Sequence, residues 1–303
     1  MSYRTILAVI DGTVNDYRVL EAALAVGRPC EARITALYAD TDPSGLPAAY
    51  VGDGAGVYLS QDLWEALEVQ IGEQRELARA HFEDWKHRGG LRDAVEQTAG
   101  LTARLVVETG RTTHLLAKHG PVTDLIVTAL PGPGEVGPGM IGPGMIGPGM
   151  IGRDMALEAA LFDTGRPALA IPATGATTVS QGAPIVIAWN GKPEAARALA
   201  GALPFLASSR GEVIVLTAIE RDVSRPLAPV IDYLARHGVA ARWVELAGHD
   251  GGIGALLLDE AAKRGAGLLV MGAYTHNRWR EVVLGGVTRH VLKHAALPIL
   301  LAH

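Results

Sequence analysis

The chain repeats itself, because four short apolar runs of its first half recur in the same order in its second half. The matched pairs are Ile6–Gly12 with Ile185–Gly191, Ala103–Gly110 with Ala241–Gly248, Leu125–Val127 with Leu268–Val270, and Arg166–Ala173 with Leu297–His303. Four matches in one order, each a run of β-type residues, are not expected by chance. We infer a duplicated unit, so the fold must be one that this chain can build twice.

The two copies differ in length, and the difference locates insertions and a linker. The first copy spans 156 positions from Asp11 to Pro167, whereas the second spans 108 from Asn190 to Pro298. Part of the excess lies at residues 131–153, where GPGMI occurs three times in succession. A chain of 303 residues is long enough for two domains. We therefore predict a first domain at residues 1–173, a polar linker at residues 174–183 and a second domain at residues 184–303.

Within each copy, short Val/Ile/Leu runs alternate with segments of helical periodicity. Continuous apolar runs are typical of strands buried on both faces of a parallel sheet. This order predicts an α/β protein made of two tandem, doubly wound parallel-sheet domains of Rossmann-like type. Ligands of such folds bind beyond the carboxyl ends of the strands, where the strand order reverses. That rule directs attention to Asp11, Leu130, Asn190 and Gly272.

The periodicity also makes predictions about individual side chains. Asn15 is predicted to cap the helix that follows the first strand. Residues 60–86 are predicted to form one long helix with the inward positions Leu63, Trp64, Leu67, Ile71, Leu77 and Phe82. The tryptophans predicted to lie in the core are Trp64, Trp85, Trp189 and Trp243.

Composition excludes several classes of protein. Hydrophobic residues make up 49% of the chain and charged residues 19%, which suffices for a large core and excludes wholesale disorder. A formal net charge of -5 argues against a nucleic-acid partner. Cys30 is the single cysteine, so disulfide frameworks and multi-cysteine zinc sites are excluded. Since neither a membrane span of about 20 apolar residues nor a signal peptide is recognisable, we expect a cytoplasmic protein.

A glycine-rich segment near the end of the second copy follows a predicted strand and reads GAYTHNRWREVVLGGVTRHVLKHAALPILL. Backbone N–H groups at such a turn, together with the dipole of the next helix, favour phosphate. With the ILAVIDG opening and the duplication, the chain resembles the universal stress protein family in its tandem form, which has the adenine nucleotide alpha hydrolase-like fold. The resemblance implies a nucleotide site at Asn190, Gly272, Thr275, Gly285, Gly286, Val287 and Thr288.

Half of the family's nucleotide motif is present in this segment. Nucleotide-binding members carry Gly-x-x-Gly, nine residues, and then Gly-Ser or Gly-Thr. Gly272 and Gly285 match, whereas Thr275 replaces a glycine and Gly286 replaces the hydroxyl residue, a loss worth about 1.5–3 kcal/mol of phosphate binding. Asn190 stands where the family has an acidic residue. The resemblance implies that ATP with magnesium could bind the second domain, and a packed turn without a ligand is the open alternative.

The first copy lacks the phosphate motif, although Asp11 matches the family's acidic residue. Gly132–Gly137 reads GPGEVG, but Pro138 follows, so no helix opens there as a dinucleotide site requires. The GPGMI repeats predict an exposed flexible or polyproline-like loop. Their Met and Ile residues leave a lid or partner-docking surface open as an alternative. We expect the nucleotide site of this copy to be lost.

The function that follows is that of a non-enzymatic stress-response protein, since the sequence contains no catalytic triad, paired carboxylates or Walker loop. The alternative is an interaction module without nucleotide that recruits a protein or lipid partner. A hydrolase is disfavoured by Asn190 and by the lack of a general base. The scattered histidines, His81 and the His290–His294 pair among them, are predicted to have no ligand role.

The resemblance also carries an expectation about assembly. In the family, the last strand of each domain supports dimer-like pairing. We therefore predict that Ala168–Ile171 pairs with Ile299–Leu301 inside one chain, and we expect the protein to form a homodimer as well.

Overall fold

The computed structural model describes residues 2–40, 61–94, 100–130, 153–218, 228–246, 252–273 and 286–303. In the first half, the elements are β1 (Thr5–Ile10), α1 (Asn15–Gly27), β2 (Arg33–Asp40), α2 (Gln61–Gly89), β3 (Arg92–Asp93), β4 (Thr102–Thr109), α3 (Thr112–His119), β5 (Leu125–Ala129), α4 (Arg153–Phe162) and β6 (Ala168–Ile171). In the second half, they are β7 (Ile185–Ala188), α5 (Pro193–Ser208), β8 (Val213–Ala218), α6 (Ala228–Arg236), β9 (Ala241–Leu246), α7 (Gly252–Lys263), β10 (Leu268–Gly272), α8 (Gly286–His294) and β11 (Ile299–Ala302).

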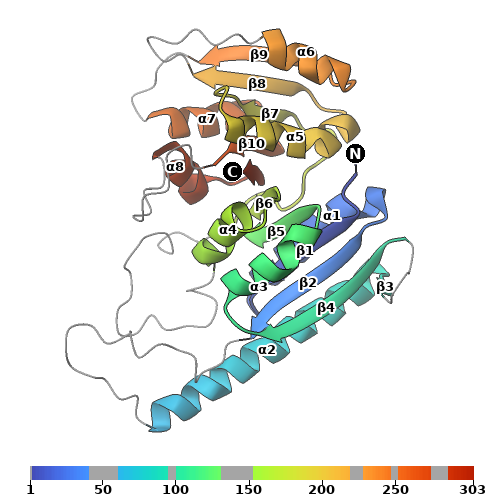
Figure 1. Cartoon of the computed structure of the whole chain (residues 1–303), viewed down its shortest axis with the longest axis vertical. Helices are drawn as coiled ribbons and strands as arrows, with labels where there is room; N and C mark the ends of the chain where they lie inside the picture. The colour runs from blue at the N-terminus through green and yellow to red at the C-terminus, as the bar shows by residue number, and fades with distance from the viewer. Residues whose placement is uncertain are drawn as a thin grey trace, which may run out of the picture.

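The strands form one eleven-stranded sheet in the order β3-β4-β2-β1-β5-β6-β11-β10-β7-β8-β9. Neighbouring strands are parallel throughout, except where β6 meets β11. Apart from the additional edge strand β3 in the first half, the two halves have the same strand order, read outward from the centre in opposite directions (Figure 1). The α/β fold class with doubly wound parallel halves is confirmed.

The two halves join through the predicted pair of final strands. β6 and β11 run antiparallel, with Ile299 opposite Ala170 and Leu301 opposite Ala168. The predicted intrachain pairing is confirmed, and a homodimer remains a prediction. The residues between the halves, 174–183, contain no helix or strand, and the division into two domains at this point also remains a prediction.

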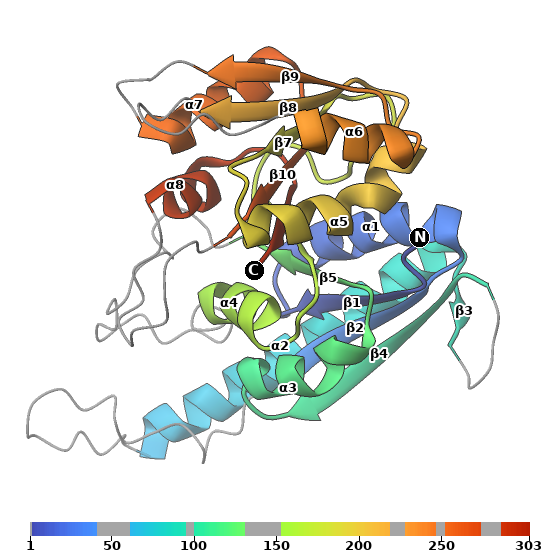
Figure 2. The same ribbon diagram turned by 45° about the horizontal axis from the view of Figure 1, so that its top comes forward.

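Helices cover both faces of the sheet, and each face has one apolar cluster that runs through both halves (Figures 1 and 2). One cluster contains side chains of α1, α2, α5 and α6. The other contains side chains of α3, α4, α7 and α8. Because the strands are buried between these layers, their continuous apolar sequences are explained. None of the described helices is both long enough and apolar enough to span a membrane.

The long helix α2 matches its prediction in extent but not in every inward position. Ile71 and Phe82 are buried as predicted, whereas Leu77 is 47% exposed. The next residue, Ala78, is buried instead, so the buried face of α2 contains Ala78 and not Leu77. The side chains of Leu63, Trp64 and Leu67 lie outside the described residues, as does the GPGMI segment.

Two further side-chain predictions are wrong. Val14 occupies the cap position of α1, where Asn15 was expected, and Asn15 is the first helical residue. Trp243 is 51% exposed on β9, although its neighbours suggested a core position. Trp85 lies fully in the core as predicted, and Trp189 is partly buried against the apolar cluster that contains Trp85. Trp243 is exposed because β9 is an edge strand of the sheet.

Candidate functional site

Each half has one place where its strand order reverses, between β1 and β5 in the first half and between β7 and β10 in the second. In doubly wound sheets, a crevice for ligands opens at the carboxyl ends of such a strand pair. The residues singled out from the sequence lie at these ends. Asp11 and Leu130 follow β1 and β5, whereas Asn190 follows β7 and Gly272 ends β10.

In the second half, Asn190 shapes the loop that leads from β7 into α5. Its side-chain Oδ1 accepts a hydrogen bond from the backbone N–H of Lys192 at 3.0 Å. Such an Asx turn fixes the loop locally. Gly191 has φ +69° and is exposed, so the tip of this turn faces solvent in the described structure.

Gly272 lies where β10 meets the first turn of α5. A Cβ atom at this position would come within 2.6 Å of the Ala195 backbone nitrogen and 2.7 Å of the Glu194 carbonyl carbon. Because these are backbone atoms, no side chain can move aside to make room. The packing of α5 on β10 therefore demands glycine here, independently of any ligand.

The described part of helix α8 runs from Gly286 to His294. Gly286 is exposed, and a Cβ atom there would meet nothing within 4 Å. Thr288 is only 5% exposed, so its hydroxyl lies on the inner side of the helix. The first-turn N–H groups of a helix lack partners within the helix and attract anions. Thr275 and Gly285, the other residues of the motif, lie outside the described residues.

Two polar atoms near these strand ends escaped the sequence analysis. Glu194 Oε2, in the first turn of α5, and Thr217 Oγ1, near the end of β8, are buried and have no hydrogen-bond partner among the described residues. Buried polar atoms are nearly always paired, so each of these is a candidate to meet a ligand or water. A Glu in the first turn of a helix is common, so the sequence carried no signal for this role.

In the first half, the same loop is tied by a buried carboxylate. Asp16, which is 1% exposed, accepts hydrogen bonds from the backbone N–H groups of Asp11 at 2.9 Å and Gly12 at 3.0 Å. Its Oδ2 atom also lies 3.0 Å from Nδ1 of His81 on α2. Burial and the neighbouring charge of Asp11 raise the pKa of Asp16 to about 6.

Asp11 itself is turned toward its own loop. Its Oδ1 atom accepts hydrogen bonds from Thr13, at 3.1 Å from the backbone nitrogen and 2.6 Å from the hydroxyl. The side chain that the family resemblance associates with a nucleotide is thus used, at least in part, to hold the turn.

The helix α2 closes over this loop. A Cβ atom on Gly12, which has φ +79°, would lie 2.5 Å from the carbonyl oxygen of Gln74. The next residue of α2, Arg75, forms a 3.0 Å ion pair with Asp40 at the end of β2. Burial of the Tyr38 side chain, together with the Asp40 carboxylate, raises the pKa of Tyr38 to about 12. The crevice of the first half is therefore occupied by the chain's own groups.

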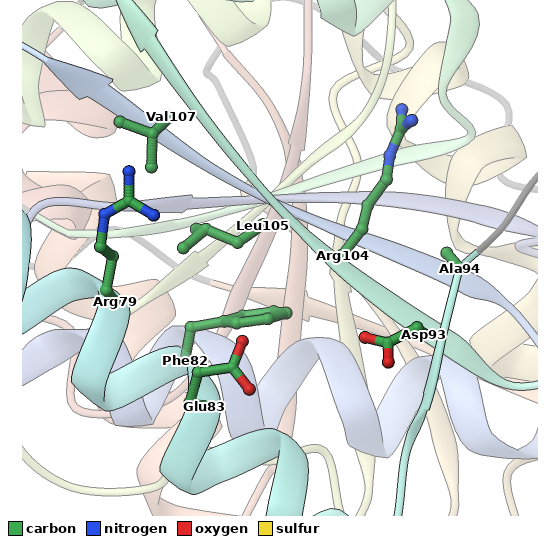
Figure 3. Close-up of a pocket in the computed structure, with 8 residues that line it drawn as sticks. All are labelled: Arg79, Phe82, Glu83, Asp93, Ala94, Arg104, Leu105 and Val107. Atoms are coloured by element: carbon green, nitrogen blue, oxygen red, sulfur yellow. The ribbon is translucent and has the colours of Figure 1, made fainter.

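A surface groove of about 460 Å³ lies elsewhere, between α2 and the strands β3 and β4 (Figure 3). Phe82, Leu105 and Val107 form its apolar part, and Arg79 and Glu83 stand at its side. None of the residues predicted from the sequence as site residues lines this groove. Among the described residues, no cluster of three or more His, Cys, Asp or Glu side chains could hold a metal ion.

Comparisons with known proteins agree with this architecture. The universal stress protein family model matches residues 183–303. A universal stress protein from Archaeoglobus fulgidus is similar over 100% of this chain and 99% of its own, with a TM-score of 0.68 and 15% identity.

A second structure, described as a putative universal stress protein from Pseudomonas aeruginosa, covers 99% of this chain and 93% of its own, with a TM-score of 0.55 and 14% identity. A protein of unknown function from the same species covers 99% of this chain and 92% of its own, with a TM-score of 0.54 and 14% identity. No curated protein sequence matched the chain. Residues 183–303 match the universal stress protein family, and the chain as a whole shares the fold of the solved universal stress proteins.

Proposed function

We propose that the second half binds one adenine nucleotide, ATP with magnesium, and that the protein is a nucleotide-responsive stress protein without catalysis. The observation that carries the proposal is the placement of Asn190 and Gly272. They end two strands that pair directly, since Ala188 of β7 lies opposite Met271 of β10. Gly272 also begins the connection that ends at α8, whose first turn is exposed at Gly286.

The groups at this position suit a phosphorylated ligand. The first-turn N–H groups of α8 supply donors for phosphate, and the exposed Arg289 adds a positive charge on the same turn. Glu194 Oε2 is an acceptor without a partner, which suits a ribose hydroxyl or a base amino group. When bound, the nucleotide would supply the signal, and the protein residues would hold and orient it.

The second candidate is an interaction module that binds no nucleotide. Thr275 and Gly286 depart from the family motif, and the crevice of the first half is filled by Asp16 and α2. Both crevices would then be structural, and the protein would act through a protein or lipid partner.

Calorimetric titration with ATP and magnesium separates the two candidates. We expect saturable binding with one site per chain and no ATP turnover. Two sites per chain would contradict the closed state of the first half, and no heat up to millimolar ATP would favour the interaction module.

Gly286→Asp gives the sharper test. An aspartate at a helix start stabilises the helix, and the position is open, so the fold should be kept or strengthened. The same charge would repel phosphate, so ATP binding should be lost. Gly182→Asp, at an exposed glycine with nothing within 4 Å of its Cβ position, is the matched control and should leave binding unchanged. Full ATP affinity in Gly286→Asp would overturn the placement of the site.

A further inference from the structure

The residue that follows β11, His303, holds the start of the candidate nucleotide loop. Its Nδ1 atom lies 3.2 Å from the carbonyl oxygen of Ala273, so this nitrogen carries the hydrogen and donates it. The N–H group of Ala273 donates in turn to the Ala302 carbonyl at 2.8 Å. Ala273, which is fully buried, is thereby fixed on both sides directly after Gly272.

The imidazole ring of His303 also contacts the first half of the molecule. Its centroid lies 4.4 Å from that of Phe162, with the two planes inclined at 59°. Phe162 is the last residue of α4 and packs against the apolar cluster on that face. The carboxyl terminus lies beside α4 in both overall views (Figures 1 and 2). One ring therefore touches a helix of the first half and the loop start of the second.

The equivalent position in the first half lacks this tie. Leu130 donates its N–H to the Ile171 carbonyl at 2.7 Å, just as Ala273 donates to Ala302. The residue after Ile171 is Pro172, whose side chain has no hydrogen-bond donor. The backbone arrangement is thus common to both halves, and the side-chain tie belongs to the second half alone.

We propose that His303 is a positioning residue that couples nucleotide binding in the second half to the packing of α4 in the first. The inference rests on the proposed function, because it assigns the regulation of that same site. Ala273 directly follows Gly272 at the carboxyl end of β10, so loosening His303 frees the strand end that faces the proposed ligand. Coupling of this kind is reciprocal, so a bound nucleotide also steadies α4, the helix that follows the GPGMI segment.

The first test measures ATP affinity by calorimetry. His303→Ala and Phe162→Ala should each weaken binding by about threefold to tenfold, and the double variant should be no weaker than the weaker single one. Pro172→Ala is the matched control at the equivalent strand end and should bind as the wild type does. Unchanged affinity in His303→Ala, or fully additive losses in the double variant, would overturn the proposal.

A conservative variant separates positioning from general damage. In His303→Asn, the side-chain amide can replace the Nδ1–H donor, but no ring remains to contact Phe162. It should bind ATP more tightly than His303→Ala and about as tightly as Phe162→Ala, which also loses only the ring contact, while hydrogen exchange within α4 stays as fast as in His303→Ala. Affinity as poor as that of His303→Ala would show that the hydrogen bond to Ala273 is not the positioning contact.

The second test needs no nucleotide, so it distinguishes failure of the coupling from failure of the proposed function. In the free protein, Phe162→Ala should speed exchange of the Ala273 amide at least threefold, and Pro172→Ala should not. Unchanged exchange would overturn the tie between α4 and the loop, whatever the wild type binds. If the wild type binds no ATP but this exchange responds, the nucleotide assignment fails and the mechanical tie stands.

Discussion

The two halves share a strand order and differ at the loop after their first strand. Gly12 of the first half is buried beneath α2, whereas its counterpart Gly191 in the second half is exposed. The covering helices differ as well, because the described part of α2 has 29 residues and that of α6 has nine. In the first half, the N–H groups of this loop donate hydrogen bonds to the carboxylate of Asp16.

This difference shows how a duplicated domain can divide its tasks. A crevice filled by internal hydrogen bonds gains order and loses room for a ligand. The second copy has an exposed loop at the equivalent position. Under the proposed function, stability and binding belong to different copies of one fold, and this division can be tested by placing the same substitution in both.

The largest contrast is expected for alanine at the two equivalent glycines. Gly12→Ala forces a left-handed residue and drives its Cβ into the Gln74 carbonyl, which together should cost about 2–5 kcal/mol of the free energy of unfolding. Gly191→Ala carries the left-handed penalty of about 1–2 kcal/mol and lies in the open. Urea denaturation of both variants measures the difference. Equal losses would show that α2 does not close the first loop.

The buried Asp16 should make the stability of the first half depend on pH. Its pKa is raised to about 6 in the folded state, from 3.8, so the folded protein binds this proton more tightly than the unfolded chain. Protonation of Asp16 stabilises the folded protein by about 3 kcal/mol. This stabilisation is complete below about pH 4 and is lost as the pH rises through 6. Charged groups facing the carboxylate are Asp11 on its own loop and His81 on α2.

Asp16→Asn removes this titration. The free energy of unfolding of the variant minus that of the wild type should therefore be larger at pH 7 than at pH 4.5. The expected change is about 2 kcal/mol, measured by urea denaturation. Asp84→Asn, on the exposed face of α2, is the control. Its free energy of unfolding should differ from that of the wild type by the same amount at both pH values. A pH-independent difference for Asp16→Asn would contradict a buried carboxylate that titrates near neutrality.

The duplication was predictable from the sequence because it depends on local patterns. The four repeated runs correspond to β1 and β7, β4 and β9, β5 and β10, and β6 and β11. The matching ends, RPALAIPA and LPILLAH, are the strands β6 and β11, and the expectation that they pair came from the family resemblance. The repeats themselves require only the order and spacing of residues along the chain.

The closure of the first crevice was not predictable, because it depends on contacts across the fold. His81 is 65 residues from Asp16, and neither residue type nor spacing reveals their pairing. No local pattern around Asp16 indicates that its carboxylate accepts hydrogen bonds from the N–H groups of Asp11 and Gly12. The orphaned Glu194 Oε2 was missed for a similar reason, because burial of one atom follows from packing against β10 and not from the local sequence.

A smaller effect should come from the contact that locks the halves on the α5 face. Tyr3 of the first half donates its hydroxyl to the Gly201 carbonyl in α5, and its ring lies 5.4 Å from that of Phe205. Tyr3→Phe removes one buried hydrogen bond, so it should cost about 0.5–1.5 kcal/mol in urea denaturation. Tyr233→Phe, on the surface of α6, is the control. No loss in Tyr3→Phe would show that this contact does not hold the halves together.

The smallest effect is expected at the outer edge of the second half. Trp243 occupies the position that corresponds to Leu105 of β4, where α2 provides cover and α6 does not. Because Trp243 is 51% exposed, Trp243→Leu should change the free energy of unfolding by less than about 0.5 kcal/mol. Trp85→Leu, at a fully buried site, should cost about 2 kcal/mol or more. A large loss for Trp243→Leu would mean that β9 is covered in solution, and the second half would then be as closed along its edge as the first.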